Sequence, residues 1–103
     1  MPAVSRHLVD KARTGHTCTS RIGVIASQFS VFANGSPILR PGDALIPHTI
    51  LVPCEDGLCC KMHPAFVTKG SSSVFIQGVP VARQGDKADK GNCTSTSNVF
   101  AGG

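Results

Sequence analysis

Three aspartates in the chain are each followed, at a similar distance, by a side chain that binds metals. The offset is six residues from Asp10, five from Asp43 and seven from Asp86. The side chains at these three positions are His16, His48 and Cys93. Imidazole and thiolate are the ligands that zinc prefers in structural sites. The recurrence predicts that the three side chains converge on one metal ion.

His63 is the predicted fourth ligand. Three imidazoles and one thiolate arranged as a tetrahedron form a closed site, which is structural rather than catalytic, so one structural Zn²⁺ is expected. Three cysteines close to His63 in the sequence could replace it as the ligand; these are Cys54, Cys59 and Cys60. His7 has no counterpart after the other aspartates and is expected at the surface.

The state of the remaining cysteines is open from sequence. Cys54 and Cys59 could close a short disulfide loop after export, whereas Cys18 has no evident partner. The chain holds five cysteines, so they cannot all pair. In a protein made in the cytosol, free and partly buried thiols are as good an alternative as any disulfide.

An internal repeat indicates how these residues are positioned. VFANGSPILRPGD at residues 31–43 returns as VFIQGVPVARQGD at residues 74–86. Each copy reads as a β-hairpin, with two short apolar runs around a glycine turn, and Asn34-Gly35 is the strongest turn signal. An Asp after Gly at a strand end usually accepts hydrogen bonds within a turn, so Arg40 and Arg83 are expected to pair with the aspartates that end their repeats.

The two ends of the chain supply a third copy. Residues 98–103 resemble the first half of the repeat, and residues 3–6 resemble its second half. Three such hairpins predict an all-β, conical, pseudo-threefold monomer, a shape that suits the axis of a trimer. Pairing of the ends is expected to bury Val99 and Phe100.

The bulk composition narrows the class of protein. The chain of 103 residues is expected to form one domain, 1–103, with a small core and little helix. Among the connectors 11–28, 44–72 and 87–96, only residues 44–52 are apolar enough for a further strand. No apolar run is long enough for a membrane span or a secretory signal, so a soluble protein made in the cytosol is expected.

Charge and motifs argue against two further functions. The net charge is +4, but the basic residues are scattered and no aromatic stacking platform accompanies them, so no nucleic-acid partner is expected. The sequence contains no nucleophile elbow, phosphate loop or HExxH, so we do not expect an enzyme. A thiol-dependent hydrolase is the weakest of the alternatives.

The chain resembles the PAAR-repeat proteins over nearly its whole length. Pro80-Val81-Ala82-Arg83, with Gly78 before it and Gly85-Asp86 after it, is similar to their Pro-Ala-Ala-Arg signature. The hairpin starts near Val31 and Val74 and the end of the chain also resemble that family. One segment departs from it, because residues 6–10 read Arg-His-Leu-Val-Asp where the family usually has Arg-x-Gly-Asp.

The resemblance implies a function. Such proteins form a small cone with zinc near its apex. His16, His48, His63 and Cys93 look like the residues that bind this zinc. The broad base sits, one copy per trimer, on the β-helical spike of a contractile injection machine, a phage tail or a type VI secretion system. The tip would contact the target membrane transiently, and the protein would be located in a virion or secreted. The chain ends directly after the last hairpin, so a bare tip without an effector domain is expected, and a small zinc or disulfide adaptor that tethers an effector is the alternative.

Overall fold

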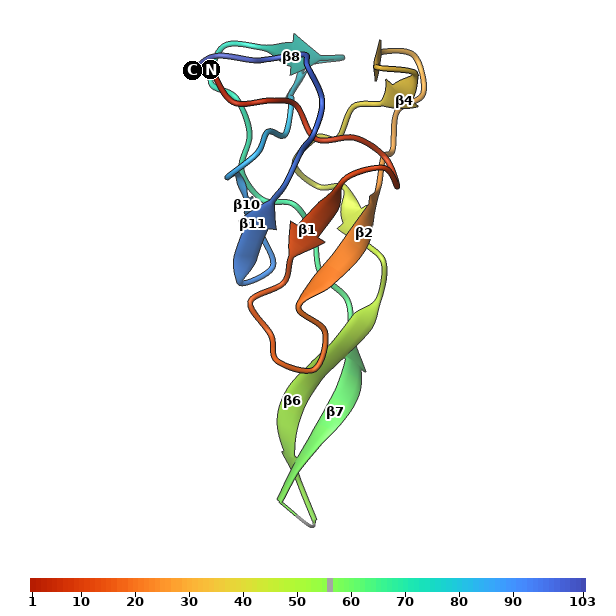
Figure 1. Ribbon diagram of the computed structural model, residues 1–103, viewed down its shortest axis with the longest axis vertical. Helices are drawn as coiled ribbons and strands as arrows, with labels where there is room; N and C mark the ends of the chain where they lie inside the picture. Colours follow the sequence, from red (N-terminus) through yellow and green to blue (C-terminus); the bar gives the residue numbers. More distant parts are fainter. Residues whose placement is uncertain (56) are drawn as a thin grey trace.

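The computed structural model describes residues 1–55 and 57–103 and shows an elongated all-β molecule (Figure 1). The principal extents are 47 × 23 × 23 Å. The described residues form no helix, and therefore no helix long and apolar enough to cross a membrane. The strands are β1 Lys11–Arg13, β2 Arg21–Ile25, β3 Phe32–Ala33, β4 Ser36–Pro37, β5 Ala44–Leu45, β6 His48–Cys54, β7 Gly57–His63, β8 Phe75–Ile76, β9 Val79–Pro80, β10 Lys87–Ala88 and β11 Gly91–Cys93.

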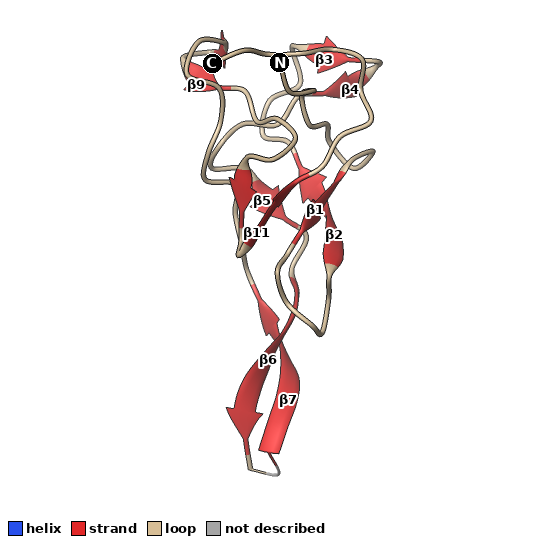
Figure 2. Ribbon diagram, turned by 60° about the vertical axis from the view of Figure 1, so that its left-hand side comes forward, coloured by secondary structure: helices blue, strands red, loops and turns tan. Residues whose placement is uncertain are grey.

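The broad end of the cone, here called the base, consists of the three predicted hairpins (Figure 2). β3 pairs with β4 and β8 pairs with β9, each around a two-residue turn. Both turn residues have positive φ in each hairpin, 50° at Asn34 and 82° at Gly35, then 52° at Gln77 and 79° at Gly78. This geometry favours asparagine and glycine, which explains why Asn-Gly predicted the turn. The two chain ends form the third pair through an antiparallel bridge between Ala3 and Phe100.

A closed ring of backbone hydrogen bonds establishes the pseudo-threefold axis. Ser5 N donates to Ala82 O at 2.9 Å, Ala82 N to Leu39 O at 2.8 Å, and Leu39 N to Ser5 O at 3.0 Å. These residues occupy the same position in the three copies and are all fully buried. The conical all-β fold with three related hairpins, predicted from the repeat, is confirmed.

The arginine that ends each copy holds the copies together. Arg83 makes two hydrogen bonds to Asp86, at 3.0 and 3.1 Å, and reaches Gly102 O in the C-terminal strand. Its predicted pairing is confirmed. The prediction for Arg40 is wrong for the side chain, because its guanidinium donates to Ile76 O in the next hairpin and only its backbone N–H donates to Asp43.

In each base hairpin a phenylalanine and the aliphatic residue after it point to opposite sides of the strand. Small aliphatic side chains point inward into a buried cluster, and phenylalanines point outward. The cluster holds Val4, Ala33, Ile38, Ile76, Val81 and Ala101. The expectation that Phe100 is buried is wrong, because this residue is 55% exposed and Ala101 beside it is 1% exposed. Val99 is likewise 38% exposed.

Below the base, a five-stranded sheet in the order β10-β11-β1-β2-β5 forms the body. A second buried cluster, including Val24, Leu39 and Leu45, fills it. From the body extends one long hairpin, β6–β7, which we call the tip hairpin (Figure 1). Its register runs from His48 opposite His63 to Cys54 opposite Gly57. The prediction that only residues 44–52 form a further strand is wrong, because β1, β2, β10 and β11 lie in the other two connectors and β7 lies in the same one. β7 was missed because its cysteines, lysine and glycine give no clear apolar alternation.

Candidate metal centre

Three histidines from separate segments converge on one carboxylate. His16 Nε2 lies 3.0 Å and His63 Nε2 lies 3.2 Å from Asp89 Oδ1, and His48 Nε2 lies 2.7 Å from Asp89 Oδ2. The four donor atoms lie within 4.8 Å of one another. The imidazole centroids are 5.1 to 5.9 Å apart. We call these four residues the histidine cluster.

The root of the tip hairpin positions two of these histidines. His48 begins β6 and His63 ends β7, and they face each other as the first pair of the ladder. Directly opposite residues of antiparallel strands place their side chains on the same face, so the two imidazoles meet there. The hairpin continues beyond this pair to its turn, so the cluster lies at the root of the hairpin and is set back from the point of the cone.

Two tight turns bring the other two members to that face. Asp89 follows β10 in a turn and has φ of 54°, a left-handed conformation that Asp tolerates better than most residues. His16 follows Gly15, which has φ of 78°. A Cβ at Gly15 would lie 2.8 Å from Lys90 Cβ, so glycine allows the β1–β2 loop to approach the turn that carries Asp89.

The hydrogen bonds of His48 show that a cation fits the histidine cluster. Its Nδ1 lies 3.0 Å from Ile46 O, and because a carbonyl only accepts, Nδ1 must carry a proton. In neutral imidazole Nε2 then has a lone pair, which faces a carboxylate oxygen of Asp89 at 2.7 Å. Two lone pairs at this distance repel each other unless a proton or a metal ion interacts with both. The carbonyl also fixes the imidazole with Nε2 toward the cluster, as is usual for metal ligands.

Burial and charge favour a divalent ion at this place. The side chains of His48, Asp89 and His16 are 0%, 5% and 9% exposed, and that of His63 is 26% exposed. Burial opposes ionisation of Asp89, but the three imidazoles that face it favour the carboxylate and hold its pKa below the ordinary value. One carboxylate and three imidazoles in a buried position can hold a metal ion with four protein ligands, which is the arrangement of a structural site.

The PAAR motif matches residues 14–96 of the 103-residue chain. This chain belongs to the PAAR-motif family. The match covers all four residues of the histidine cluster and two of the three base hairpins. The PAAR motif is known from spike-tip proteins of contractile injection machines, and the family is structural. No significant match to a curated protein sequence accompanies the family match.

In this PAAR protein the structure brings together three of the four residues predicted as ligands. His16, His48 and His63 meet, but Cys93 does not join them. Cys93 lies in β11 opposite Ala12 and is 1% exposed within the core of the body. Burial, with smaller contributions from Asp86 and Asp10, raises the pKa of its thiol to about 12. A thiol in this position packs as a small apolar side chain.

Asp89 is the residue that sequence reasoning missed. Counting forward from Asp86 to the next histidine or cysteine passed over Asp89 at the third position and stopped at Cys93. Two signals pointed to it. Carboxylate oxygen is also a zinc ligand, and Asp89-Lys90-Gly91 is a turn sequence that breaks the run between two short strands.

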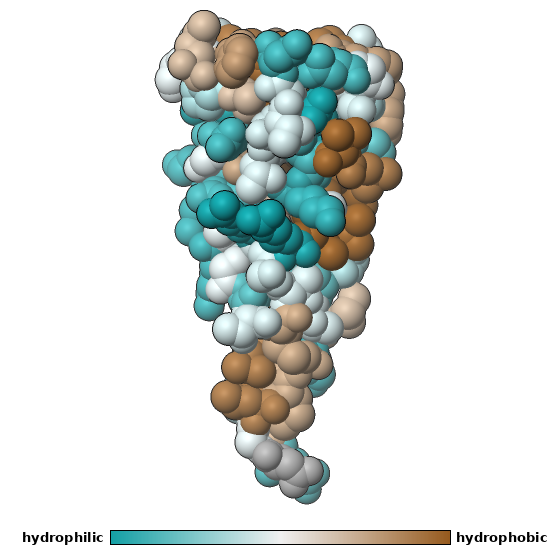
Figure 3. All heavy atoms as spheres, in the orientation of Figure 1, coloured by the Kyte–Doolittle hydropathy of each residue, from teal (hydrophilic) through white to brown (hydrophobic). Residues whose placement is uncertain are grey.

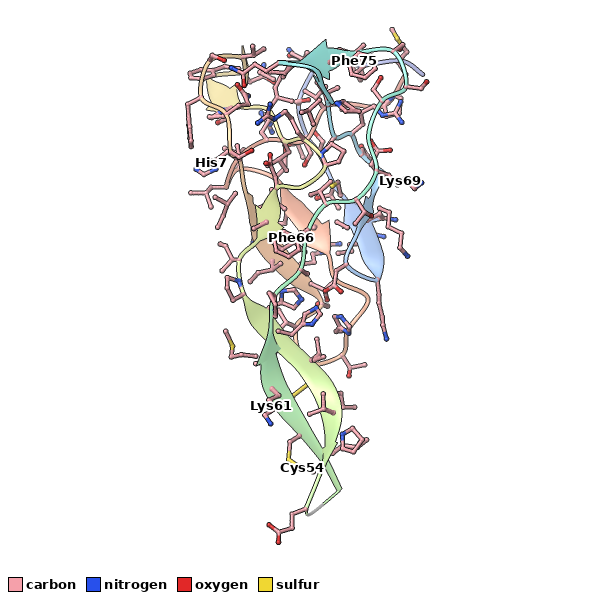
Figure 4. The ribbon with its side chains drawn as sticks, turned by 180° about the vertical axis from the view of Figure 1, so that it is seen from behind. His7, Cys54, Lys61, Phe66, Lys69 and Phe75 are labelled. Atoms are coloured by element: carbon pink, nitrogen blue, oxygen red, sulfur yellow. A yellow bond between two sulfur atoms is a disulfide. The ribbon has the colours of Figure 1, made fainter. Side chains whose placement is uncertain are left out.

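Two disulfides support the same region. Cys18 pairs with Cys60, and Cys54 pairs with Cys59, which the sequence had left open (Figure 4). The first disulfide ties the loop that carries His16 to the strand that ends in His63. Cys54, Cys59 and Cys60 are therefore not available as thiolate ligands in place of His63.

Proposed function

We propose that this protein caps the trimeric β-helical spike of a contractile injection machine, a phage tail or a type VI secretion system, with one copy on each trimer. The proposed role is mechanical and not enzymatic: it sharpens and stiffens the point that meets the target envelope. The protein would act in a virion or as a secreted tip. Its pseudo-threefold base can present a similar surface to each of three spike chains.

Three equivalent phenylalanines on the base carry this proposal. Phe32, Phe75 and Phe100 come from the three hairpins and are 51%, 53% and 55% exposed. The valines that precede them are also partly exposed, at 41%, 39% and 38%. Large apolar side chains that remain exposed at symmetry-related positions are typical of an interaction surface. Short strands at the base also leave backbone groups to which strands of the spike could add.

We also propose that the histidine cluster binds one Zn²⁺ through His16, His48, His63 and Asp89. Its purpose is to fix the root of the tip hairpin to the body, because the ligands come from both. In a domain with so small a core, the metal is expected to contribute a large share of stability. The sequence analysis predicted the thiolate of Cys93 as a ligand, and this proposal has the carboxylate of Asp89 in its place.

Variants of the base test the capping proposal. Phe75→Asp is expected to reduce co-purification with the trimeric spike, since it places a charge in an apolar contact. Phe66→Asp is the matched control, because Phe66 is 50% exposed on the body, away from the base (Figure 4). Equal spike binding by both variants and the unaltered protein would argue against docking through the base.

The adaptor function is the second candidate, favoured by one apolar flank. Leu8, Val9, Ile25 and Phe29 are 53%, 56%, 37% and 63% exposed. Their segments are neighbours, because Leu8 N donates to Val24 O at 2.9 Å and the ring of His7 packs against that of Phe29. The other two repeats have glycine at the position equivalent to Leu8, namely Gly42 and Gly85, so only the first repeat carries an apolar side chain there. Leu8 adopts a φ of 57° at this position. An effector held on this flank should co-purify without the spike and be lost in Val9→Asp.

A further inference from the structure

The histidine cluster consists of two halves that different parts of the fold hold together. His16 and Asp89 form one half, which belongs to the body. Lys90 N donates to Thr14 O at 3.1 Å, and this bond joins the loop that carries His16 to the turn that carries Asp89. The two histidines at the root of the tip hairpin form the other half, because they face each other in the ladder. A metal ion bound by all four residues needs both halves at the correct distance and angle.

The body anchors the chain on either side of the tip hairpin. Ile46 N donates to Gly23 O at 2.9 Å, and Leu45 N donates to Ala65 O at 2.9 Å. Beyond these anchors the molecule narrows, and the tip hairpin stands clear of the body (Figure 3). The anchors fix the place where the hairpin begins, so its orientation depends on contacts farther along its strands.

A disulfide and a pair of threonines join the hairpin to the loop that carries His16. Cys18 in this loop is bonded to Cys60 in β7. The hydroxyl oxygens of Thr19 and Thr49 lie 2.8 Å apart and share a hydrogen bond. Because the disulfide is covalent, it is the stronger constraint on the orientation of one half of the histidine cluster relative to the other.

The disulfide and the histidines lie on opposite faces of the hairpin. Cys60 and His63 are three residues apart in β7, and successive side chains of a strand alternate between its faces. The sulfur of Cys60 therefore does not take the place of His63 in the cluster. The loop is attached to one face of the hairpin by the disulfide, and its imidazole meets the histidines of the other face.

We propose that the Cys18–Cys60 disulfide makes the zinc affinity of the histidine cluster depend on the redox state of the protein. In the oxidised protein the disulfide holds the two halves of the cluster together, so the four ligands are preorganised. In the reduced protein the halves can move apart, and the apparent affinity falls with the fraction of molecules in which they meet. This redox control rests on the proposed zinc site and adds to it a dependence on the surroundings.

The redox step requires an oxidant of the disulfide class, for which oxidised glutathione is the probe. The thiols of Cys18 and Cys60 pass two electrons and two protons to the oxidant, whose S–S bond breaks to give two thiols as the new S–S bond forms. Cys60 is exposed, so a thiol reagent can approach it. Cys93 is 1% exposed and does not compete in the exchange. Surroundings that keep thiols reduced therefore favour weak zinc binding, and oxidising surroundings favour tight binding.

The other disulfide of the hairpin is a matched control. Cys54 and Cys59 are five residues apart in the chain and lie at the far end of the hairpin. Their bond joins β6 to β7 and makes no connection to the loop that carries His16. Its loss should leave the two halves of the histidine cluster in place.

Zinc titration against a chromophoric chelator tests the redox control. It compares the oxidised full chain with a chain that carries Cys18→Ser and Cys60→Ser and with a control that carries Cys54→Ser and Cys59→Ser. Loss of the first disulfide should weaken zinc binding about tenfold, as is typical when a group that orients metal ligands is removed. The control should bind zinc like the full chain. The melting temperature of each chain with and without zinc reports on folding.

A redox titration of the unaltered chain measures the same coupling without any substitution. Coupling between two sites is reciprocal, so zinc should make the Cys18–Cys60 disulfide about tenfold harder to reduce, which is about 30 mV in reduction potential. The chain is equilibrated in glutathione buffers with and without zinc, and the thiols are alkylated and located by peptide mass. The potential of Cys54–Cys59 should not shift.

The possible results separate the redox control from the zinc site. Equal zinc affinity of the three chains, or an unshifted potential of Cys18–Cys60, overturns the redox control and leaves the zinc site standing. Equal weakening in both substituted chains overturns the assignment to Cys18–Cys60. Tighter binding by the reduced than by the oxidised full chain also overturns it, because the thiolates then act as ligands. If none of the chains binds zinc, the zinc site and its redox control are both wrong.

Discussion

Deleting residues 98–103 tests whether the terminal hairpin is an integral part of the fold. Val99 O accepts a hydrogen bond from Val4 N at 2.8 Å, and Gly102 O accepts one from Arg83 Nη1 at 3.0 Å. Ala101 is 1% exposed in the base cluster. The deletion therefore leaves two buried donors without these acceptors and removes a buried methyl group.

The size of the effect follows from these three losses. A buried N–H without an acceptor costs about 1–3 kcal/mol, and a charged donor that loses its acceptor costs about 1.5–3 kcal/mol. The buried methyl group contributes about 0.8 kcal/mol. The free energy of unfolding should fall by roughly 3–7 kcal/mol, compared with about 5–15 kcal/mol for a whole domain. The melting temperature is then expected to fall by at least about 12 °C.

Thermal and urea unfolding of three chains measure this effect. They are the full chain, the chain without residues 98–103, and a control without Gly103 alone, whose carbonyl accepts from the exposed Ser72 hydroxyl at 3.2 Å. The control should melt like the full chain. If the longer deletion also melts like the full chain and keeps its metal, the terminal hairpin is dispensable and the threefold interpretation of the base is wrong.

Three further predictions concern the metal, the thiol and pH. His48→Ala should abolish zinc binding and lower the melting temperature sharply, whereas Cys93→Ala should leave bound zinc, measured by plasma mass spectrometry, unchanged; loss of zinc in Cys93→Ala would contradict the ligand set. Because burial raises the pKa of Cys93 to about 12, Ellman's reagent should find no thiol in the native protein and one after denaturation without reductant. Burial opposes ionisation of Asp10, but hydrogen bonds, chiefly from Arg6, hold its pKa below 3.8, so its stabilising contribution is present above about pH 4 and is lost as pH falls below that. Asp10→Asn should flatten this acid dependence of the melting temperature.

The base could be predicted from sequence because its signals are local. Asn34-Gly35 specifies a hairpin turn within four residues, and the second copy repeats the signal. The pairing of the chain ends followed from the repeat alone. The sequence did not show which side chains of the terminal strand point inward, because Val99, Phe100 and Ala101 are all apolar. Phe100 was therefore predicted to be buried, whereas the buried residue is Ala101.

The tip and the fourth member of the histidine cluster depend on contacts between distant segments. Cys18 and Cys60 are 42 residues apart, and no local pattern distinguishes this pairing from the others. Asp89 reaches the histidines because a turn places it there, whereas Cys93 four residues later points into the core. His16 and His48 could be predicted because each follows an aspartate that ends a repeat, whereas His63 was suggested only as a histidine of the longest connector that could supply a fourth ligand.

The stoichiometry of the complex with the spike tests the central claim most directly. The protein should be mixed with the trimeric spike protein encoded by the same phage or secretion system and weighed intact by native mass spectrometry. One copy bound to three spike chains is predicted, because a single pseudo-threefold base meets all three chains. A stable complex of three copies with three spike chains, or a tight trimer of this protein alone, would contradict it.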